Sequence, residues 1–579
     1  MKIKHLFGLA VIAAMSASCS SNEDLGTAGP GTGTNEAGVG YATFTINLPS
    51  TNGTRADNPT YEQGTLDEYD VNDVTLLIFK KAGKSEDEYT FVEKADLGNM
   101  APWKAEGSNG ITASATITAK LSNVDLTNED SKSDYYALAI LNNNADANGA
   151  GKVKLPTTSD TYSSWNVAAN TDVAKFTNNT KGYYMANAPV FVAGEEPTTL
   201  VNIDKVYATK QKAETNAATT IHVERGLAKV TVAALPTGMT PSGTKYTSDK
   251  VDITAWNLDV TNKSTFPIHK TTGLNSPFTT IWSASTDPAP STGRFVDAAN
   301  SAFKRVHWGV DPNYSDGLTT VDACTDAFNI LPANATINGA ADKPQYCLEN
   351  TFDLDNMKQG QTTRVVFKAT YTPSVLSSPS ETDKTFFMIG NSLDIWTTKT
   401  LKDQIASKAK EALSITTDPT VELRGDLLTA GTHVLTKSNV SIKIKEGETE
   451  TEKVDDKLVA TLNTKLGLDK DKGIGIKTYK NGESYYIARI KHFGDDLTPW
   501  AEGQATYGTN DNDNNTKYLG RYGVLRNNWY ELKVGSVSGP GTPDVPTIKP
   551  DEPDDESYKY ISVSVKILSW AKRTQNVDL

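Results

Sequence analysis

The sequence lacks the residue patterns on which most enzyme active sites depend. Among its 579 residues are only six histidines and three cysteines. None of the histidines belongs to a His-Glu-x-x-His motif or to a Cys/His zinc spacing, and neither a Gly-x-Ser-x-Gly elbow nor a Walker A sequence occurs. We therefore expect a protein that is not an enzyme, with no catalytic residue, no metal site and no cofactor.

Long basic runs and long apolar runs are missing as well. The chain has 57 Lys plus Arg against 70 Asp plus Glu, which gives a formal net charge of −13. Because no basic run is able to follow a phosphate backbone, nucleic acid is not expected as a partner. No segment approaches the length of a membrane-spanning helix, about 18 apolar residues, so a lipid is the only membrane anchor that the sequence offers.

The N-terminus has the pattern of an export signal. Two lysines precede an apolar run at residues 6–15, which is too short to span a bilayer. The run ends in Ser16-Ala17-Ser18-Cys19, which resembles the lipobox at which bacterial signal peptidase II cuts and the cysteine is acylated. Residues 20–24 are similar to the acidic tag of surface-displayed lipoproteins of Bacteroidota. We expect a signal peptide at 1–18 and a lipid on Cys19; the alternative is an ordinary signal peptide with an unrelated cysteine.

The residues that are plentiful favour a mainly β protein. Gly, Thr, Ser, Asn and Val are common and long helical patterns are few, which indicates short strands joined by polar turns. Residues 20–40 form a polar tether. Residues 41–48 then alternate strictly and predict a half-buried strand. The apolar face of that strand consists of Ala42, Phe44, Ile46 and Leu48.

Other segments predict further strands and two helices. Strand patterns lie at residues 74–79, 135–141 and 526–534. Within residues 221–232 the alternation changes phase near Gly226, as a β-bulge would require. Helical spacing of apolar residues predicts two packing helices. One contains Leu401, Ile405, Ala409 and Ala412, and the other contains Leu458, Leu462 and Leu466.

A single arginine lies in the turn-rich segment after the first strand. Arg55 is the only one of the ten arginines that precedes Arg225. An Arg-specific protease that meets an exposed loop here would cut between Arg55 and Ala56. The position between a lipid-tethered strand and a folded domain favours such processing; the alternative is an ordinary exposed arginine.

The C-terminus combines a proline-rich spacer with one more strand. Residues 539–553 are rich in Gly, Pro and acidic residues, which predicts an extended, semi-rigid spacer. Residues 560–570 return to strand alternation, and their apolar face consists of Ile561, Val563, Val565 and Ile567. The pattern therefore predicts a β-strand on a long spacer.

Two cysteines remain in the exported part of the chain. Cys324 and Cys347 enclose a loop that a disulfide would close with a gain of about 3 kcal/mol. The alternative is a pair of buried free thiols that pack as small apolar groups.

The order of these motifs resembles the Bacteroidales (type V) fimbrillins, in particular the Mfa-like major fimbrium subunits. The resemblance covers the lipoprotein signal, the first strand, the Arg55 loop, the spacer and the terminal strand. It also rests on Val223-Glu224-Arg225-Gly226-Leu227-Ala228-Lys229-Val230 and on Arg526-Asn527-Asn528-Trp529-Tyr530. The Cys324 and Cys347 pair is not part of that pattern.

The resemblance implies two transthyretin-like β-sandwich domains with a few short helices. It implies a propeptide at 19–55, an N-terminal domain at 56–215, a C-terminal domain at 216–538, and a spacer with donor strand at 539–579. A gingipain-like protease would cut at Arg55 and release the strand that carries Ala42 to Leu48. A neighbouring subunit would then fill the groove with Ile561, Val563, Val565 and Ile567.

We therefore predict a stalk subunit of a surface fimbria, exported as a lipoprotein precursor to the outer membrane and active in adhesion and biofilm formation. Its expected partners are other copies of itself, accessory anchor and tip subunits, the processing protease, and a ligand on a host or bacterial surface. One alternative is a tip or accessory adhesin, although tip subunits of this family tend to lack the terminal strand. Another is a surface glycan-binding lipoprotein, for which some of Trp256, Trp282, Trp308 and Trp396 would form a stacking platform.

Overall fold

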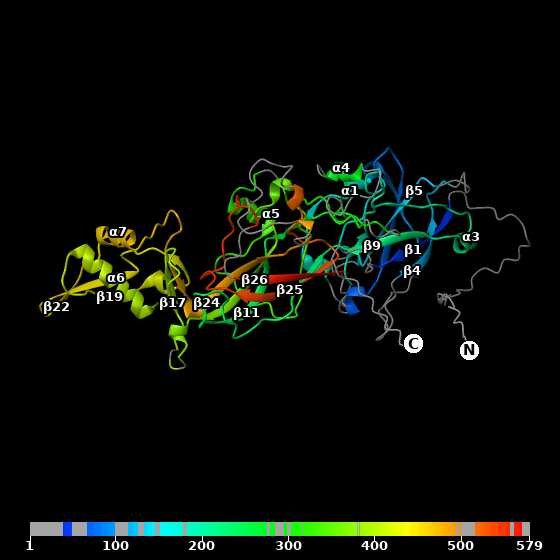
Figure 1. The fold of residues 1–579 in the computed structure, drawn as a ribbon. Helices are drawn as coiled ribbons and strands as arrows, with labels where there is room; N and C mark the ends of the chain where they lie inside the picture. Colours follow the sequence, from blue (N-terminus) through cyan, green and yellow to red (C-terminus); the bar gives the residue numbers. More distant parts are fainter. Residues whose placement is uncertain are drawn as a thin grey trace, which may run out of the picture.

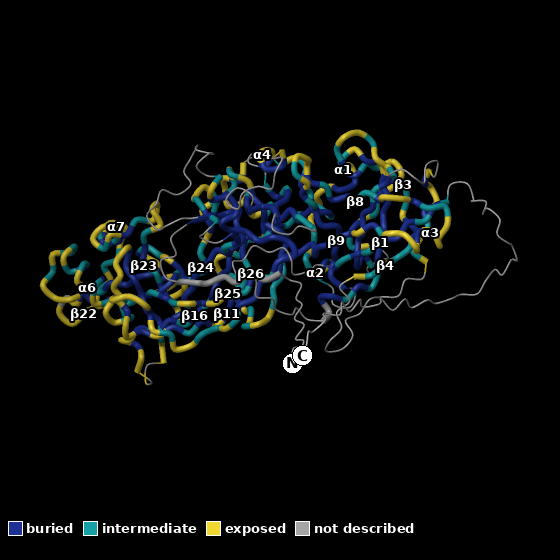
Figure 2. The backbone as a smooth tube through the Cα atoms, turned by 45° about the vertical axis from the view of Figure 1, so that its right-hand side comes forward, coloured by how far each residue is buried: buried dark blue, intermediate teal, exposed yellow. Residues whose placement is uncertain are grey.

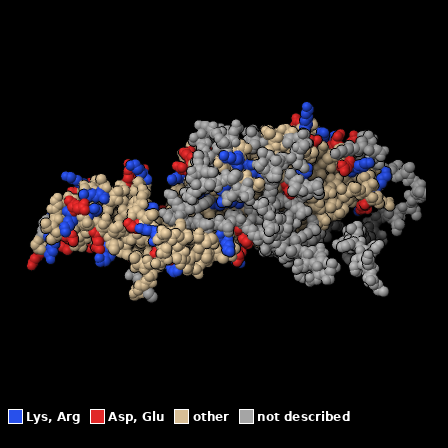
Figure 3. All heavy atoms as spheres, in the orientation of Figure 1, with Lys and Arg blue, Asp and Glu red and all other residues tan. Residues whose placement is uncertain are grey.

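The computed structural model confirms a mainly β protein with a few short helices. It describes residues 39–48, 66–98, 114–125, 133–144, 151–177, 182–274, 278–283, 294–297, 303–314, 317–378, 380, 382–493, 497–498, 516–555 and 561–569. The described residues form an elongated molecule, in which an N-terminal sheet, a C-terminal sandwich and a small lobe with α6 and α7 follow one another (Figure 1). Acidic and basic side chains intermingle on the lobe surface drawn in Figure 3.

The N-terminal sheet has the strand order β3-β2-β5-β7-β9-β1-β4, and β8 also pairs with β5. Its apolar core takes side chains from both ends of this order, including β1, β4, β9, β2 and β5, so the sheet folds over onto itself. Trp165 and Phe176, on two one-turn helices, cover the other face of β2 and β5. The bounds are β1 Gly40–Asn47, β2 Val74–Lys80, β3 Thr90–Lys94, β4 Ser114–Leu121, β5 Tyr135–Leu141, β7 Met185–Asn187, β8 Val201–Asn202, β9 Thr219–Arg225, α1 Tyr162–Trp165 and α2 Val173–Phe176.

The C-terminal sandwich packs the sheet β15-β10-β25-β26 against the sheet β11-β16-β24. Alternate residues of the central strand β16, such as Phe367 and Tyr371, enter the core between the sheets and are fully buried. In Figure 2 buried residues run through the middle of the molecule, and exposed residues lie mainly at its rim. The bounds are β10 Ala228–Val232, β11 Lys250–Asp259, β15 Gln345–Cys347, β16 Arg364–Thr372, β24 Glu483–Arg489, β25 Asn528–Val537 and β26 Ile561–Ser569. The remaining short elements are β6 Ala169–Asn170, β12 Thr261–Asn262, β13 Ser264–Thr265, α4 Phe278–Trp282, α5 Val321–Ala327 and β14 Phe328–Asn329. Helix α3 Lys210–Thr215 contacts β1 and β4 of the N-terminal sheet (Figure 1).

The lobe is inserted between β16 and β24 and has its own apolar core. Both predicted helices are confirmed here: α6 buries Leu401 and Ile405, and α7 buries Leu458 and Leu462. Thr397 caps the first turn of α6, and Asp455 caps that of α7. The bounds are β17 Phe386–Ile389, β18 Trp396–Thr397, α6 Thr398–Leu413, β19 Thr420–Leu423, β20 Gly431–His433, β21 Val440–Glu446, β22 Thr449–Glu452, α7 Asp456–Lys465 and β23 Ile476–Tyr479.

The predicted bulge at Gly226 is wrong, because the change of phase marks the passage from one sheet to the other. β9 ends at Arg225 in the N-terminal sheet, and β10 begins at Ala228 in the C-terminal sandwich. A Cβ atom on Gly226 would lie 2.8 Å from the ring of Tyr184, so only glycine fits the crossing. The predicted domain boundary at residue 215 falls before β9, which still belongs to the N-terminal sheet.

The segment predicted as an extended, semi-rigid spacer packs along the C-terminal sandwich over residues 539–555. Val545 and Ile548 are only 1% and 3% exposed and enter two small apolar clusters. Thr542 exchanges two backbone hydrogen bonds with Tyr485 at 2.8 and 2.9 Å. The two apolar side chains between the prolines thus hold an extended segment against the domain.

Candidate functional site

Strand β1 lies inside the N-terminal sheet, although it is the first element of the described chain. It pairs antiparallel with β4 along its whole length and parallel with β9 from Phe44 to Asn47. All four predicted core residues, Ala42, Phe44, Ile46 and Leu48, are 3% exposed or less. On the other face, the hydroxyls of Thr43 and Thr118 hydrogen bond at 2.9 Å.

The strands on both sides of β1 have further attachments in the sheet. β9 pairs with β7, and β4 is tied to the chain after β3 by two backbone hydrogen bonds between Asp96 and Lys120 at 2.9 and 3.1 Å. The carboxylate of Glu93 also accepts from the backbone N–H of Ser122 at 2.9 Å. Loss of β1 would therefore leave two supported strands with unpaired facing edges and an apolar floor between them.

Strand β26 is at the edge of the C-terminal sheet. Its backbone pairs antiparallel with β25, from Ile561↔Val537 to Ser569↔Asn528, and with no second strand among the described residues. The chain itself connects this sheet with the N-terminal sheet. β26 pairs with β25 and β25 with β10, and β10 continues the chain from β9, the neighbour of β1.

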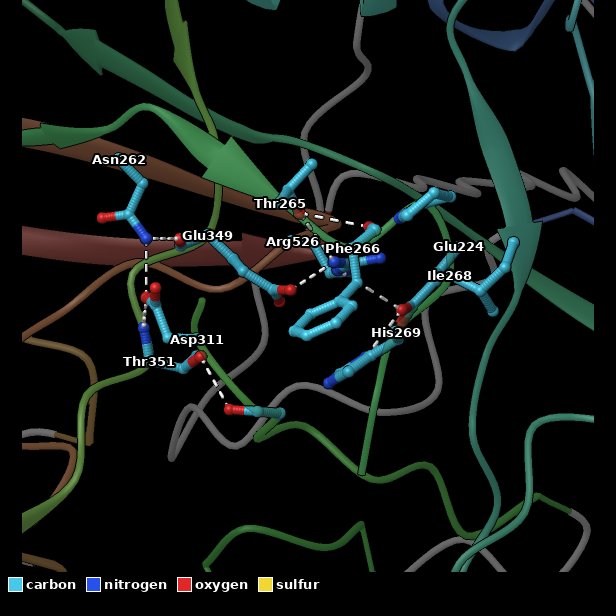
Figure 4. Close-up of polar contacts among 12 residues, drawn as sticks. Glu224, Asn262, Thr265, Phe266, Ile268, His269, Asp311, Glu349, Thr351 and Arg526 are labelled. Carbon is cyan, nitrogen blue, oxygen red and sulfur yellow. Dashed lines mark hydrogen bonds and ion pairs between the residues drawn. The ribbon is translucent and has the colours of Figure 1, made fainter. Parts of the chain in front are cut away.

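A buried ionic cluster lies where β9 crosses into β10. The carboxylate of Glu224 contacts His269 Nδ1 at 2.8 Å, accepts from Arg305 Nε at 2.8 Å, and lies 3.8 Å from Arg526 Nε. Arg526 also donates to Glu349 (Figure 4). Burial raises the pKa of the Glu224 carboxyl, but the positive charges around it outweigh burial and hold the pKa at about 2. Glu224 is therefore ionised at neutral pH.

A second buried ion pair joins the first element after the Arg55 loop to the same crossing. Glu68, in the short helix Leu66–Tyr69, accepts from Lys229 Nζ at 2.7 Å and from the Tyr346 hydroxyl at 2.8 Å. Its backbone carbonyl accepts from Arg225 Nη2 at 2.7 Å. The ammonium of Lys229 also lies 4.1 Å from the centre of the Trp529 ring.

The two motifs on which the family resemblance rests thus meet at one place. Glu224, Arg225 and Lys229 come from the first motif, and Arg526 and Trp529 from the second. Sequence reasoning did not identify Glu68, His269, Arg305 or Glu349, because each is a lone polar residue without a motif around it. This cluster binds the sheet that contains β1 to the sandwich that contains β26.

The structure places the other predicted residues away from this cluster. Cys19, Arg55 and Ala56 lie outside the described residues. The possible disulfide is not formed, since Cys324 and Cys347 are free and buried in different apolar clusters. Burial raises the pKa of their thiols to about 11 and about 12.

The suggested tryptophan platform is corrected by the burial of its members. Trp256 and Trp308 are fully buried and Trp282 is 5% exposed, so these three rings belong to apolar cores. Trp396 packs against the core of the lobe. In the described part of the chain no helix is long and apolar enough to cross a bilayer, and no group of three metal-ligating side chains occurs.

Comparison with known families finds one match. Residues 477–576 match the family described as major fimbrial subunit protein type IV, fimbrillin, C-terminal. The matched segment includes β24, β25, the docked spacer and β26. The match supports a role as a fimbrial subunit, a structural protein of a cell-surface appendage.

The solved structures that match the chain are distant in sequence, and they align with TM-scores below 0.5. The fimbrilin FimA from Porphyromonas gingivalis W83 is 12% identical with a TM-score of 0.36, and the comparison covers 92% of this chain and 99% of that one. The tip fimbrial protein Mfa3 from P. gingivalis, with C-terminal truncation, is 11% identical (TM-score 0.27, 92% and 100%). A fimbrial assembly protein from Parabacteroides distasonis ATCC 8503 is 9% identical (TM-score 0.25, 72% and 100%). No curated protein matches the chain.

Proposed function

We propose that this protein, whose residues 477–576 match the fimbrillin C-terminal family, is the stalk subunit of a surface fimbria that polymerises by strand exchange. In this proposal Cys19 carries the lipid of an outer-membrane precursor, and an Arg-specific protease cuts between Arg55 and Ala56. The released strand is β1, and β26 of a neighbouring copy replaces it.

One observation carries the proposal: β1 is enclosed by β4 and β9, but its only covalent link to them passes through the segment that contains Arg55. After a cut in that segment, β1 is held by non-covalent contacts alone. Burial of Phe44, Ile46 and Leu48 contributes about 1.5–3 kcal/mol each and that of the Ala42 methyl about 0.8 kcal/mol, roughly 5–10 kcal/mol in all before ordering costs. Another strand with four apolar residues at the same spacing recovers a similar free energy.

The exchange gains further stability from hydrogen bonding. Within its own chain β26 pairs with β25 alone, whereas in the place of β1 it would pair with both β4 and β9. Each additional backbone hydrogen bond contributes about 0.5–1.5 kcal/mol. Exposure of the free edge of β25 and detachment of residues 539–555 cost free energy that opposes this gain. In the uncut monomer β1 occupies the groove and no other strand enters. After the cut β1 leaves, and the groove accepts the strand of a neighbour.

The orientation of β1 determines how the incoming strand enters. β1 runs parallel to β9, which continues into β10, so its C-terminal end faces the C-terminal sandwich and its N-terminal end the far side of the N-terminal sheet (Figure 1). A neighbour beyond that far end inserts its tail in the direction of β1. Each subunit then receives at one end and donates from the other, a heterologous contact that produces an open filament.

Cleavage of purified precursor tests the proposal. The wild type and Arg55→Ala are incubated with an Arg-specific protease and compared by electrophoresis in detergent with and without heating. We expect a ladder that heat dissolves from the wild type and none from Arg55→Ala. Absence of a ladder from cleaved wild type would contradict the stalk role, and so would full-length fibres on cells that express a chain ending at Ser557. A tip subunit would accept a strand but donate none, so it would cap ladders rather than extend them.

A further inference from the structure

Two adjoining cavities outside the strand-exchange groove meet at a hairpin in the N-terminal sheet region. Residues 190 and 198 exchange backbone hydrogen bonds at 2.9 and 3.2 Å, and Gly194 turns the chain with φ +83°. One cavity, of about 670 Å³, lies between the hairpin, β8 and the segment around residue 85. The other, of about 200 Å³, lies between the hairpin and α4. Both are lined by Glu195, Glu196, Pro197 and Thr272, so they form one site, which we call the hairpin cleft.

The wall of the hairpin cleft combines charged side chains with aromatic rings. Exposed Lys81 and Lys84 are on one side and exposed Glu195 and Glu196 on the other. The rings of Tyr89 and Tyr136 also line it, with centroids 4.6 Å apart. Paired carboxylates and ammonium groups bind hydroxyls as acceptors and donors, and an aromatic face packs against the C–H face of a sugar ring.

The wall is held in place by a buried carboxylate. Glu86 accepts from the backbone N–H groups of Thr199 and Leu200 at 2.8 and 2.9 Å, which ties the end of the hairpin to the segment that carries Lys84. A preformed wall reduces the ordering cost of binding a ligand.

Three polar atoms in residues that line the cleft have no hydrogen-bond partner among the described residues. They are Asn202 Oδ1, Thr272 Oγ1 and Trp282 Nε1. A buried polar group without a partner costs about 1–3 kcal/mol. These atoms lie beneath the surface of the wall, so the groups that a ligand in the cleft contacts are the exposed charged side chains and the aromatic rings.

We propose that the hairpin cleft binds a neutral oligosaccharide of two or three sugars. Its larger cavity has the volume usual for small-molecule sites, about 300–1,000 Å³. Two exposed carboxylates, Glu195 and Glu196, are matched by two exposed ammonium groups, Lys81 and Lys84, so the wall favours neither an anionic nor a cationic ligand, and the polar wall does not fit a lipid. The proposal deepens the fimbrial function by naming the class of adhesion ligand. No residue of β1, β4 or β9 lines the cleft, so assembly would leave it open.

Ligand-observed NMR tests the proposal on the full, uncleaved chain. Saturation transfer is measured to lactose, cellobiose, chitobiose and mannobiose at millimolar concentration. We expect transfer to at least one of them, and an affinity lower by about fivefold or more for Glu195→Ala/Glu196→Ala, a fold-change well above measurement error. The matched control is Asp471→Ala/Lys472→Ala, an exposed pair on the distant lobe, which should bind as the wild type does.

No transfer to any of the four sugars would overturn the proposal, and so would unchanged affinity in Glu195→Ala/Glu196→Ala. Because both residues are exposed, the double variant should keep the thermal midpoint of the wild type. Strand exchange is not required for this measurement. A negative result therefore leaves the ladder assay unaffected, and a negative ladder assay leaves sugar binding unaffected.

Discussion

Replacing Glu224 with Gln should destabilise the crossing between the two sheets more than any exposed ion-pair change. Glu224 is 2% exposed and faces Arg305, His269 and Arg526. Removal of one partner from a buried ionic cluster costs about 3–5 kcal/mol, because the remaining charges stay buried without compensation. The matched control is Glu483→Gln, whose partner Lys368 is 28% exposed, and an exposed pair contributes about 1 kcal/mol or less.

The pH dependence gives an independent measure of the same interaction. The pKa of Glu224 is about 2 in the fold against 4.5 ordinarily, a depression that corresponds to about 3 kcal/mol at 1.36 kcal/mol per unit. Because the folded pKa is depressed, this stabilisation is fully present above about pH 4.5 and is lost as the pH falls toward 2. The difference in the free energy of unfolding between wild type and Glu224→Gln should therefore shrink as the pH falls from about 4.5 toward 2.

Urea unfolding followed by tryptophan fluorescence measures both effects. We compare the urea concentrations at the midpoint of unfolding, because a chain with several folded parts need not unfold in a single two-state transition. With a slope of about 2 kcal/mol per molar, 3–5 kcal/mol lowers the midpoint at pH 7 by about 1.5–2.5 M. A shift no larger than that of Glu483→Gln would refute the assignment of the cluster as the main bond between the sheets.

Three further predictions follow from burial in other parts of the chain. Phe44→Ala should destabilise the uncleaved precursor by about 3–5 kcal/mol in urea unfolding. The dissociation of assembled fibres should stay unchanged, because in the proposed assembly β1 has left the subunit. Weakened fibres would contradict release of β1. Burial raises the pKa of Glu86 to about 7, so its contribution to the free energy of unfolding is full below about pH 4.5 and falls as the pH rises through 7. The wild type should therefore lose about 3 kcal/mol more stability between pH 5 and 8 than Glu86→Gln, measured by calorimetry. Parallel curves of stability against pH for the two proteins would contradict this. In a chain without Cys19, a thiol reagent should react with Cys324 and Cys347 only after unfolding; reaction in the native state, or none after unfolding, would contradict two buried free thiols.

Local patterns were sufficient for single elements. The helices α6 and α7 and the strand β1 follow from the spacing of their own apolar residues, because a helix or strand needs one continuous apolar face. The same reasoning misread the chain near Gly226, since a change of alternation looks the same in a bulge and in a strand that leaves one sheet for another. It also missed that residues 386–482 form a separate lobe, which depends on where the chain returns to β24.

Composition predicted the extended backbone of the spacer but not its packing against the sandwich. Gly and Pro at residues 539–553 do determine an extended backbone, but composition carries no information about a surface to which it binds. Val545 and Ile548 are buried because the sandwich presents apolar positions beside them.

The sequence by itself determined a mainly β chain and the two strands at residues 41–48 and 560–570, and it predicts an export signal and protease cleavage at Arg55. These properties depend on neighbouring residues and are readable along the chain. Only the tertiary structure decided that β1 is enclosed on both edges and that Glu68 meets Lys229 across 161 residues. Such contacts form when distant segments are buried together, where a charge is stable only beside its counter-charge.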